Sequence, residues 1–328
     1  MYEKFYHLSG LPFLLTPDSR FFFGSSGHSR AIAHLVYGLA QEEGFIVITG
    51  EVGAGKTTLV EQLWKQLDRQ TYFIARIVTT QVSADDLLRL VMDNFGIGDT
   101  PGLDKATLLR RFEFMVQEQR RAGRRCLLVV DEVQNLPLSA LEELRMLSNI
   151  TVDGHASLQT ILLGQPQFRP ILASRDAEQL RQRVLASYHL GPLTEAETRS
   201  YIDHRLKMVG WEGDPHWDDD AYAAVYRHTG GIPRRINTLC SRILLYGSLE
   251  ETHAITGAMA DITAGELSQD LGAGTVQAIS QPSLVNGGAD EYEAMLRRIE
   301  ALEASAARQD RVFRRMLDLF GAIREQPR

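Results

Sequence analysis

Short apolar runs alternate with longer amphipathic stretches over the first 190 or so residues of the chain. The apolar runs have the length of strands and lie at 45–49, 72–78, 126–131, 158–163 and 187–190. Between them, apolar positions with a period near 3.6 predict helices at 29–43, 56–67, 84–95, 105–122 and 138–147. Strands that alternate with helices are typical of a parallel sheet covered on both faces. We therefore expect residues 1–192 to form an α/β domain with a five-stranded parallel sheet.

The pattern changes after residue 192, where only helical periodicity remains. Helices are predicted at 196–209, 219–228, 233–247 and 256–267. Thr194 and Glu197 have the spacing of a capping box, which marks the start of the first of these helices. Residues 193–268 are therefore predicted to form a small all-helical domain.

The last part of the printed sequence has two different patterns. Residues 269–290 are rich in Gly, Ser and Gln and predict a flexible linker. Residues 291–324 then carry an a/d heptad with Tyr292, Ile299, Ala306, Phe313 and Phe320 at one position and Met295, Leu302, Gln309, Met316 and Ile323 at the other. This pattern predicts a coiled-coil helix, and an amphipathic helix that folds back on the core is the alternative.

The first 26 residues are rich in aromatic residues, Pro and Gly, and predict an irregular lead-in packed by its rings. Charge and composition limit the classes of function that the chain can have. The net charge is −7, and a protein that coats nucleic acid usually has a basic face, so the balance argues against that role. Cys126 and Cys240 are far apart without CxxC spacing, which fits buried apolar positions in a reducing compartment. With no signal-like start and no apolar run of about 18 residues, we expect a cytoplasmic protein.

A phosphate-binding loop follows the first predicted strand. Its sequence fits G-x-x-x-x-G-K-[ST] between a strand and a helix, which is the context that this motif requires. Backbone N–H groups of the loop would face phosphate oxygens, Lys56 would reach the β- and γ-phosphates, and the Thr57 hydroxyl would ligate Mg²⁺. The predicted ATP-binding positions are Gly50, Glu51, Val52, Gly53, Ala54, Gly55, Lys56, Thr57 and Thr58.

Two acidic residues end the third predicted strand. Asp131 and Glu132 follow the apolar run that begins at Cys126. A carboxylate at the end of a buried strand can serve the Mg²⁺ that bridges nucleotide phosphates, and a second one beside it can activate the attacking water. We assign Asp131 to the metal and Glu132 to the water, and predict an ATP-hydrolysing enzyme that uses ATP and Mg²⁺.

With these motifs in this order, the chain resembles the AAA+ superfamily of P-loop ATPases. The resemblance implies that Gln165, after the fourth strand, takes the sensor-1 position, where the family more often has Asn or Thr. It also implies an arginine before the fifth strand that acts on a neighbouring subunit's nucleotide, with Arg183 as first choice and Arg181 as the alternative. In the helical domain, Arg234 of Gly-Ile-Pro-Arg matches the sensor-2 arginine, and Arg235 is its rival.

Motifs in the N-terminal residues indicate a narrower family within this superfamily. Phe5-Tyr6, Leu11-Pro12-Phe13, Thr16-Pro17-Asp18, His28 and the run 33–39, together with Gly164-Gln165-Pro166, resemble the general secretion pathway protein A family up to about residue 268. That family continues into a membrane span and a peptidoglycan-binding part. The tail of this sequence is instead similar to secretion ATPases encoded at exosortase (PEP-CTERM) and exopolysaccharide loci.

The resemblance implies a homo-oligomer, most simply a hexameric ring, that works with inner-membrane or polysaccharide-export assembly proteins. A partner for the coiled-coil tail is a further expectation. Two alternatives stay open at this point. One is a DNA-associated AAA+ regulator, suggested by the arginines at 120–125 and at 234–235, and the other is a scaffold that nucleotide merely orders. His28 and His34 are interpreted as packing or adenine-pocket neighbours rather than as catalysts.

Overall fold

The computed structural model describes residues 2–16, 18–78, 82–152 and 154–272. Of these residues, those up to Ser248 together with Thr252–Gly265 belong to one compact unit, and Leu249–Glu251 and residues 266–272 belong to a second. The predicted coiled-coil helix and most of the predicted linker lie outside the described residues. The first unit contains both the sheet and the helices that the sequence analysis placed in two domains.

Five parallel strands form the central sheet, as predicted. They are β1(Phe45–Gly50), β2(Tyr72–Val78), β3(Arg125–Asp131), β6(Leu158–Gly164) and β7(Val184–Leu190). Their order is β2-β3-β6-β1-β7, so β1 and β3 lie on either side of β6. The carboxyl ends of these three strands therefore meet at one edge of the sheet. Strand β7 begins at Val184, three residues before its predicted start at 187.

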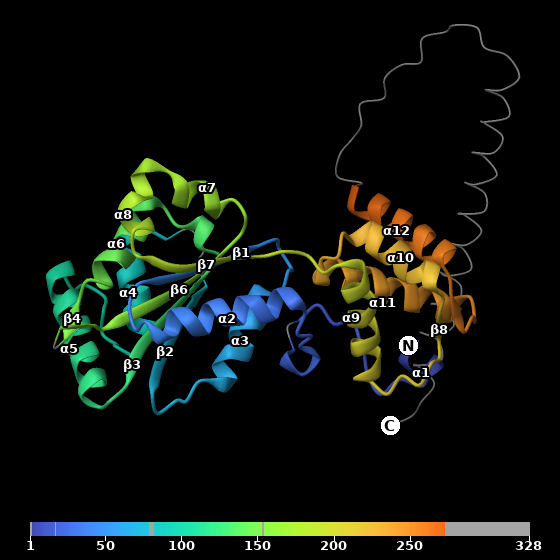
Figure 1. Ribbon diagram of the computed structural model, residues 1–328, viewed down its shortest axis with the longest axis horizontal. Coiled ribbons are helices and arrows are strands. Elements are labelled where there is room, and N and C mark those ends of the chain that lie inside the picture. Colours follow the sequence, from blue (N-terminus) through green and yellow to red (C-terminus); the bar gives the residue numbers. More distant parts are fainter. Residues whose placement is uncertain (1, 17, 79–81, 153, 273–328) are drawn as a thin grey trace, which may run out of the picture. The chain divides into compact units, whose positions relative to one another are not determined.

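Helices cover both faces of the sheet (Figure 1). The helices are α2(Ser26–Ala40), α3(Lys56–Gln66), α4(Ala84–Asn94), α5(Lys105–Arg121) and α6(Leu138–Leu147). Side chains alternate between the faces along a strand. Ile46 and Ile48 of β1 accordingly pack with α2 and α3, while Phe45 and Val47 pack with α4, α5 and α6. This double coverage explains why the strands are nearly continuous apolar runs rather than alternating ones.

Several short elements were not predicted from the sequence. They are η2(Val133–Asn135), β4(Thr151–Val152), β5(His155–Ala156), α7(Phe168–Ala173), η3(Arg175–Ala177) and α8(Glu178–Arg181). Strands β4 and β5 form a separate antiparallel pair. Elements of two to six residues are too short to show a period, so the hydrophobic pattern does not reveal them.

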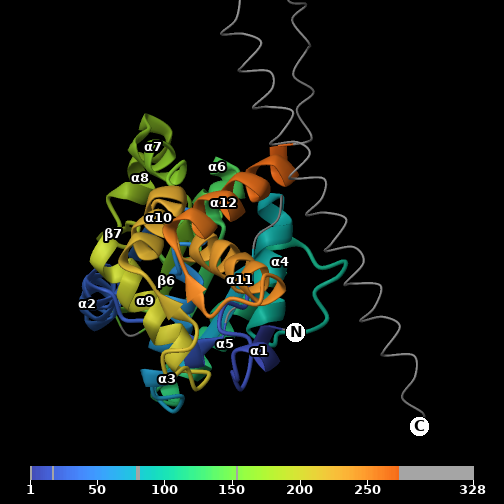
Figure 2. The ribbon, with the colours of Figure 1, turned by 90° about the vertical axis from the view of Figure 1, so that its right-hand side faces the viewer.

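The helical region consists of α9(Glu195–Lys207), α10(Asp219–Thr229), α11(Pro233–Leu249) and α12(Gly257–Gly272) (Figure 2). The predicted capping box is present: the Thr194 side chain accepts a hydrogen bond from the Glu197 N–H, and the Glu197 carboxylate accepts one from the Thr194 N–H. The helical region also contains a short parallel ladder of β8(His216–Trp217) and β9(Ala254–Ile255), which was not predicted. Helix α12 also continues past its predicted end at 267.

The aromatic lead-in packs into the core of the helical region. It contains α1(Tyr2–Phe5) and η1(Ser19–Phe21). Tyr6, Phe13 and Phe21 are buried in one cluster with apolar side chains of α9 to α12. The sequence analysis grouped these residues with the sheet domain because they precede it in the chain. Their rings instead complete the second hydrophobic core.

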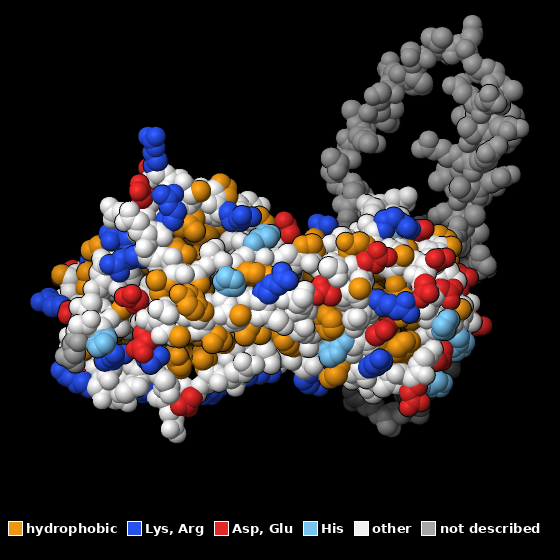
Figure 3. Space-filling view, in the orientation of Figure 1, with side chains coloured by type: hydrophobic (Ala, Val, Ile, Leu, Met, Phe, Trp, Pro, Cys, Tyr) orange, Lys and Arg blue, Asp and Glu red, His pale blue; other side chains and the backbone are white. Residues whose placement is uncertain are grey.

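The surface of the described part carries charges of both signs. On the face drawn in Figure 3, Lys and Arg side chains are interspersed with Asp and Glu. The most exposed large apolar side chains, Tyr37, Val78 and Phe114, come from three different elements, α2, β2 and α5. Isolated apolar side chains of this kind are normal on a protein surface.

Candidate functional site

The phosphate-binding loop connects the end of β1 to the start of α3. Gly53 and Gly55 have φ values of 83° and 98°, which side chains with a Cβ rarely adopt. Lys56 is only 7% exposed, and its Nζ donates hydrogen bonds to the carbonyl oxygens of Gly50 at 2.8 Å and Glu51 at 3.1 Å. The loop thus folds around its own lysine, with the ammonium group held at the N-terminus of a helix.

Burial is the main influence on that lysine. It lowers the pKa of Lys56, while the nearby carboxylates of Glu132, Asp131 and Glu51 act in the opposite direction. A buried ammonium group surrounded by carboxylates and carbonyl oxygens is well placed to exchange these contacts for an anionic ligand.

The end of β3 brings the first acidic residue to the loop. Asp131 is buried, and its Oδ2 accepts a hydrogen bond from the Thr57 hydroxyl at 2.9 Å. Its Oδ1 accepts one from the Glu132 N–H at 3.0 Å. The two residues assigned to Mg²⁺ are therefore in direct contact across 74 positions of sequence. Oxygen donors of this kind are the ligands that Mg²⁺ prefers.

Glu132 lies beside the side chain assigned to the sensor-1 position. It adopts a left-handed backbone conformation with φ of 54°, and its Oε2 accepts a hydrogen bond from Gln165 Nε2 at 2.9 Å. Gln134 donates to the same oxygen, and its own Oε1 accepts from the Gln165 N–H. The two glutamines, on loops after β3 and β6, thus fix the direction of the Glu132 carboxylate. No motif in the sequence singles out Gln134.

The net effect of these contacts is to keep Glu132 ionised. Burial alone would raise its pKa, but the hydrogen bonds from Gln134 and Gln165 and the charge of Lys56 outweigh it, so the pKa of Glu132 is lowered. A carboxylate that is ionised and fixed in direction is suited to accept a proton.

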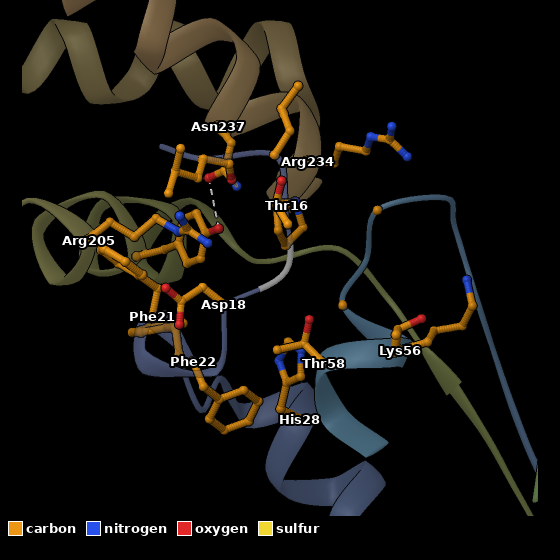
Figure 4. Close-up of a pocket in the computed structure, with 18 of the residues that line it drawn as sticks. Thr16, Asp18, Phe21, Phe22, His28, Lys56, Thr58, Arg205, Arg234 and Asn237 are labelled. Atoms are coloured by element: carbon orange, nitrogen blue, oxygen red, sulfur yellow. Dashed lines mark hydrogen bonds between the residues drawn. The ribbon is translucent and has the colours of Figure 1, made fainter. Parts of the chain in front are cut away.

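A cavity of about 360 Å³ extends from the phosphate-binding loop to the helical region. Lys56 and Thr58 of the loop and Arg234 of the helical region line it (Figure 4). Thr57 and Glu132 are lining residues as well. The Arg234 N–H donates to the carbonyl oxygen of Gly53 at 3.2 Å. Of the two arginines considered for the sensor-2 position, Arg234 lines this cavity and Arg235 is not among its lining residues.

The lead-in supplies much of the remaining wall, and the sequence analysis did not select these residues. Leu14, Leu15, Thr16, Asp18, Phe21, Phe22 and Phe23 all line the cavity. His28 lines it as well, and its Nε2 lies 2.8 Å from where a Cβ on Gly55 would be. The density of aromatic residues before the first strand was the available signal, and the analysis interpreted it as packing alone.

Arg205 joins the lead-in to helix α9 within this wall. It is 8% exposed, and its guanidinium lies over the rings of Phe21 and Tyr201 and donates to the Pro12 carbonyl oxygen at 2.8 Å. Beside it, the Tyr201 hydroxyl donates to Asn237 Oδ1 (Figure 4). Polar side chains and aromatic rings at this end of the cavity give it the composition of a base-binding pocket.

The two arginines proposed to act on a neighbouring subunit lie away from the cavity lining. Arg183 is half-buried, with Nη1 3.4 Å from the Ser148 hydroxyl oxygen. Arg181 is exposed and donates to the Ala173 carbonyl oxygen at 3.3 Å. The structure does not bring either of them to the nucleotide site of its own chain, as is required of a residue that acts in trans.

The residues present fit ATP and Mg²⁺. The loop has the positive φ values at Gly53 and Gly55 that a tight phosphate-binding turn uses, and Lys56 supplies a positive charge beside it. Thr57 and Asp131 present side-chain oxygens of the kind that Mg²⁺ prefers. Among the described residues no group of three or more His, Cys, Asp and Glu could hold a metal ion. A site with only a few protein ligands suits Mg²⁺, which usually completes its shell with phosphates and water.

Sequence comparisons agree with this site. Residues 39–172 match the family described as AAA domain. General secretion pathway protein A of Aeromonas hydrophila is 35% identical over 277 residues, which are 84% of this chain. The chain spans 50% of the length of that relative.

Comparison with solved structures agrees on the fold. Cdc6p of Pyrobaculum aerophilum aligns with a TM-score of 0.62 at 17% identity, over 79% of this chain and 74% of that one. The ADP form of the ORC2 protein of Aeropyrum pernix aligns with a TM-score of 0.57 at 14% identity, over 92% and 89% of the two chains. The RuvB Holliday junction branch migration motor of Thermotoga maritima gives 0.51 at 18% identity, over 76% and 70%.

No helix in the described ranges is long and apolar enough to cross a membrane. Four observations lead to one assignment: the sheet order, the glycine loop after β1, the acidic end of β3 and the family match over residues 39–172. The chain is an AAA+ protein with the P-loop fold, similar over most of its length to general secretion pathway protein A.

Proposed function

We propose that this protein is an Mg²⁺-dependent ATPase that works as an oligomer in envelope or exopolysaccharide assembly or in secretion. The observation that carries the enzymatic part is the arrangement around Glu132. An ionised carboxylate, directed by Gln165, faces the same cavity as Lys56 and Thr57 of the phosphate-binding loop. This combination supports hydrolysis rather than binding alone.

Each polar side chain of the site has a proposed task. Lys56 and the loop N–H groups bind the β- and γ-phosphates, and Thr57 and Asp131 hold Mg²⁺. When bound, the metal neutralises charge on the phosphates. Glu132 accepts a proton from the water whose oxygen attacks the γ-phosphorus, while the bond from that phosphorus to the ADP oxygen breaks. Gln165 orients the carboxylate through its 2.9 Å hydrogen bond.

The other end of the cavity is our proposed site for the nucleoside. The rings of Phe21 and Phe22 and the polar groups of Arg205, Tyr201 and Asn237 line it. Arg234, whose backbone contacts Gly53, would then sense the phosphates from the helical region. A nucleotide bound here would contact the lead-in, the phosphate-binding loop and the helical region together. Binding would therefore link the conformations of these three segments.

Oligomer formation is part of the proposal. Arg183 is the first candidate for an arginine supplied to the neighbouring subunit, with Arg181 as the alternative. Since Arg181 is exposed and its contacts are a carbonyl at 3.3 Å and Glu178 at 4.0 Å, it is the freer of the two. An arginine supplied in trans stabilises the charge that develops during phosphoryl transfer.

We infer the biological process from the similarity to general secretion pathway protein A. The alignment with that protein covers 84% of this chain at 35% identity. This similarity supports a role for the ATPase in an assembly or secretion machine of the envelope. We propose that it acts at the cytoplasmic side of the inner membrane, where ATP is supplied, through protein partners.

Nucleotide binding can be tested with Lys56→Ala. Removal of the buried ammonium group should weaken ATP binding by roughly 100-fold, equivalent to about 3 kcal/mol. Equilibrium binding of a fluorescent ATP analogue measures this, and Lys105→Ala, an exposed lysine on α5 that pairs with Glu143, is the control. Equal affinity of parent and Lys56→Ala would remove the loop from the nucleotide site.

The process can be tested by affinity capture from native cells with Glu132→Gln protein held in ATP. Recovery of inner-membrane or polysaccharide-export assembly proteins is expected. Recovery of a transposase or of nuclease-sensitive DNA would replace the proposed process and leave the ATPase assignment intact.

A DNA-associated function is the second candidate. The observation in its favour is that the fold resembles proteins whose names refer to DNA transactions, including RuvB and an ORC1 protein solved in complex with DNA. The interspersed charges of the surface and the net charge of −7 oppose it. Duplex binding that weakens steeply and linearly with log salt would support this function. Its absence at low salt would exclude it.

A further inference from the structure

Strand β2 contains one charged side chain within an otherwise apolar and aromatic run, Tyr-Phe-Ile-Ala-Arg-Ile-Val. The strand is at an edge of the sheet and pairs only with β3. Its neighbours Ala75 and Ile77 are buried, whereas Arg76 is half-buried, with 27% of its side chain exposed. An arginine at this position is not needed to fill the core.

Arg76 contacts the carboxylate that we assign to the metal. Its Nη2 lies 3.0 Å from Asp131 Oδ2, the same oxygen that accepts the Thr57 hydroxyl at 2.9 Å. The Asp131 side chain is 5% exposed. The guanidinium thus places a full positive charge against the metal-side oxygen of a buried carboxylate.

The guanidinium also has a second set of contacts on α3. Its Nη1 lies 3.3 Å from Glu61 Oε1, and its Cζ lies 5.8 Å from the centre of the Trp64 ring. Glu61 and Trp64 follow Thr57 on the helix that starts at the phosphate-binding loop. If the bond to Asp131 were given up, Arg76 would still have a carboxylate and a ring as partners.

If Thr57 and Asp131 hold Mg²⁺, as the proposed function requires, Arg76 and the metal would contact the same carboxylate. Two cations cannot share one carboxylate oxygen without mutual repulsion. We propose that Arg76 is a positioning residue that stands in for Mg²⁺: it holds Asp131 when the metal is absent and releases it, staying on Glu61, when the metal arrives. Arg76 thereby raises the Mg²⁺ concentration at which the nucleotide site fills.

A purely structural role predicts the opposite sign. If Arg76 only kept Asp131 in place, its removal would leave the carboxylate misplaced and the site would require more Mg²⁺. If Arg76 competes with the metal, its removal should lower the Mg²⁺ requirement. The sign of the change therefore separates the two roles.

The test is an Mg²⁺ titration of the binding of a fluorescent ATP analogue, with the full chain in the Glu132→Gln background to prevent turnover. Arg76→Gln should lower the half-saturating Mg²⁺ concentration by about five- to tenfold. Arg76→Lys keeps the charge and should stay within about twofold of the parent. Arg121→Gln, an exposed arginine on α5 paired with Glu118, is the matched control and should change nothing.

Glu61→Gln gives a second test that does not depend on the fold of the Arg76 variant. Loss of the alternative partner should strengthen the hold of Arg76 on Asp131, so the half-saturating Mg²⁺ concentration should rise. The same change in the Arg76→Gln background should have much less effect, because the two residues act through one contact.

The outcomes are distinct. An unchanged or higher Mg²⁺ requirement in a folded Arg76→Gln protein overturns the inference, as does a Glu61→Gln protein with an unchanged or lower requirement. Mg²⁺-independent nucleotide binding by the Glu132→Gln protein, or no binding, would instead overturn the proposed function on which the inference rests.

Discussion

At the residue scale, the site joins two kinds of side chain. Lys56, Thr57, Asp131 and Glu132 belong to local motifs, where residue type and spacing already indicate the chemistry. Arg205 instead reaches the Pro12 carbonyl across 193 positions of sequence, and such contacts arise only from tertiary packing. The motif residues meet the phosphates in our account, and the long-range ones meet the nucleoside.

His28 offers a residue-scale test by pH. Burial lowers its pKa, which the charge of Glu197 only partly offsets. Because the folded state resists protonation, the unfolded chain binds the proton first as pH falls below about 6.5, and stability is lost between that pH and the folded pKa. As the pH falls from 7 to 5.5, the parent should lose more stability than His28→Gln in urea unfolding.

His34→Gln is the control for this comparison, since His34 is on the same helix and its ring packs on Tyr188. Its pH profile should follow that of the parent. Parallel profiles for the parent and His28→Gln would contradict the burial argument.

At the scale of elements, the phosphate-binding loop and helix α11 are tied by a close approach. A Cβ on Gly53 would lie 2.2 Å from the Arg234 Cβ, and the Gly53 φ of 83° disfavours any side chain. The glycine is therefore required twice, once for the turn and once for the contact with the helical region. The G-x-x-x-x-G-K-[ST] pattern leaves this position free, so the motif does not account for it.

Gly53→Ala should therefore destabilise the protein by about 1–3 kcal/mol and weaken ATP binding. Thermal unfolding with and without nucleotide measures both effects. Gly98→Ala is the matched control, because a Cβ there meets no atom within 4 Å, and it should change stability by less than about 0.5 kcal/mol. A Gly53→Ala protein with parental stability and affinity would show that the contact with Arg234 is dispensable.

The helices and strands also differ in how well they could be predicted from the sequence. The long strands and helices were predictable because burial on one or both faces leaves a period, and helix 138–147 matched its prediction at both ends. The β8–β9 ladder has two residues in each strand, which is too short for any period. The core that the lead-in joins could not be predicted, because its rings carry no information on which partner they pack against.

The candidate site divides in the same way. The loop and the end of β3 were visible in the sequence, since each motif is contiguous and follows an apolar strand. Gln134, Phe21 and Arg205 were missed, because their roles depend on contacts with residues distant in sequence or on loop geometry. The role of Arg76 was hidden for the same reason: nothing in an isolated arginine indicates that it faces Asp131.

At the scale of the whole molecule, we propose that a second copy completes the active site. Neither Arg181 nor Arg183 lines the cavity of its own chain. If one of them acts in trans, specific activity should rise with protein concentration, and its replacement by Ala should lower kcat by about 10³-fold with ATP binding intact.

Mixing provides a sharper form of this prediction. The Lys56→Ala protein keeps both arginines but should not bind ATP tightly, so mixing it with the inactive arginine variant should restore activity that neither has alone. Arg121→Ala is the control and should behave as the parent does. Activity strictly proportional to concentration down to dilute monomer would contradict action in trans.

The central claim is that Glu132 activates the water at an Mg²⁺-ATP site, and the most direct test compares Glu132→Gln with the parent. ATP binding should stay within about twofold, because glutamine keeps the shape of the side chain, while single-turnover hydrolysis should fall by at least about 100-fold. Glu118→Gln, an exposed glutamate on α5, should hydrolyse ATP as the parent does. Parental hydrolysis by Glu132→Gln would contradict the account.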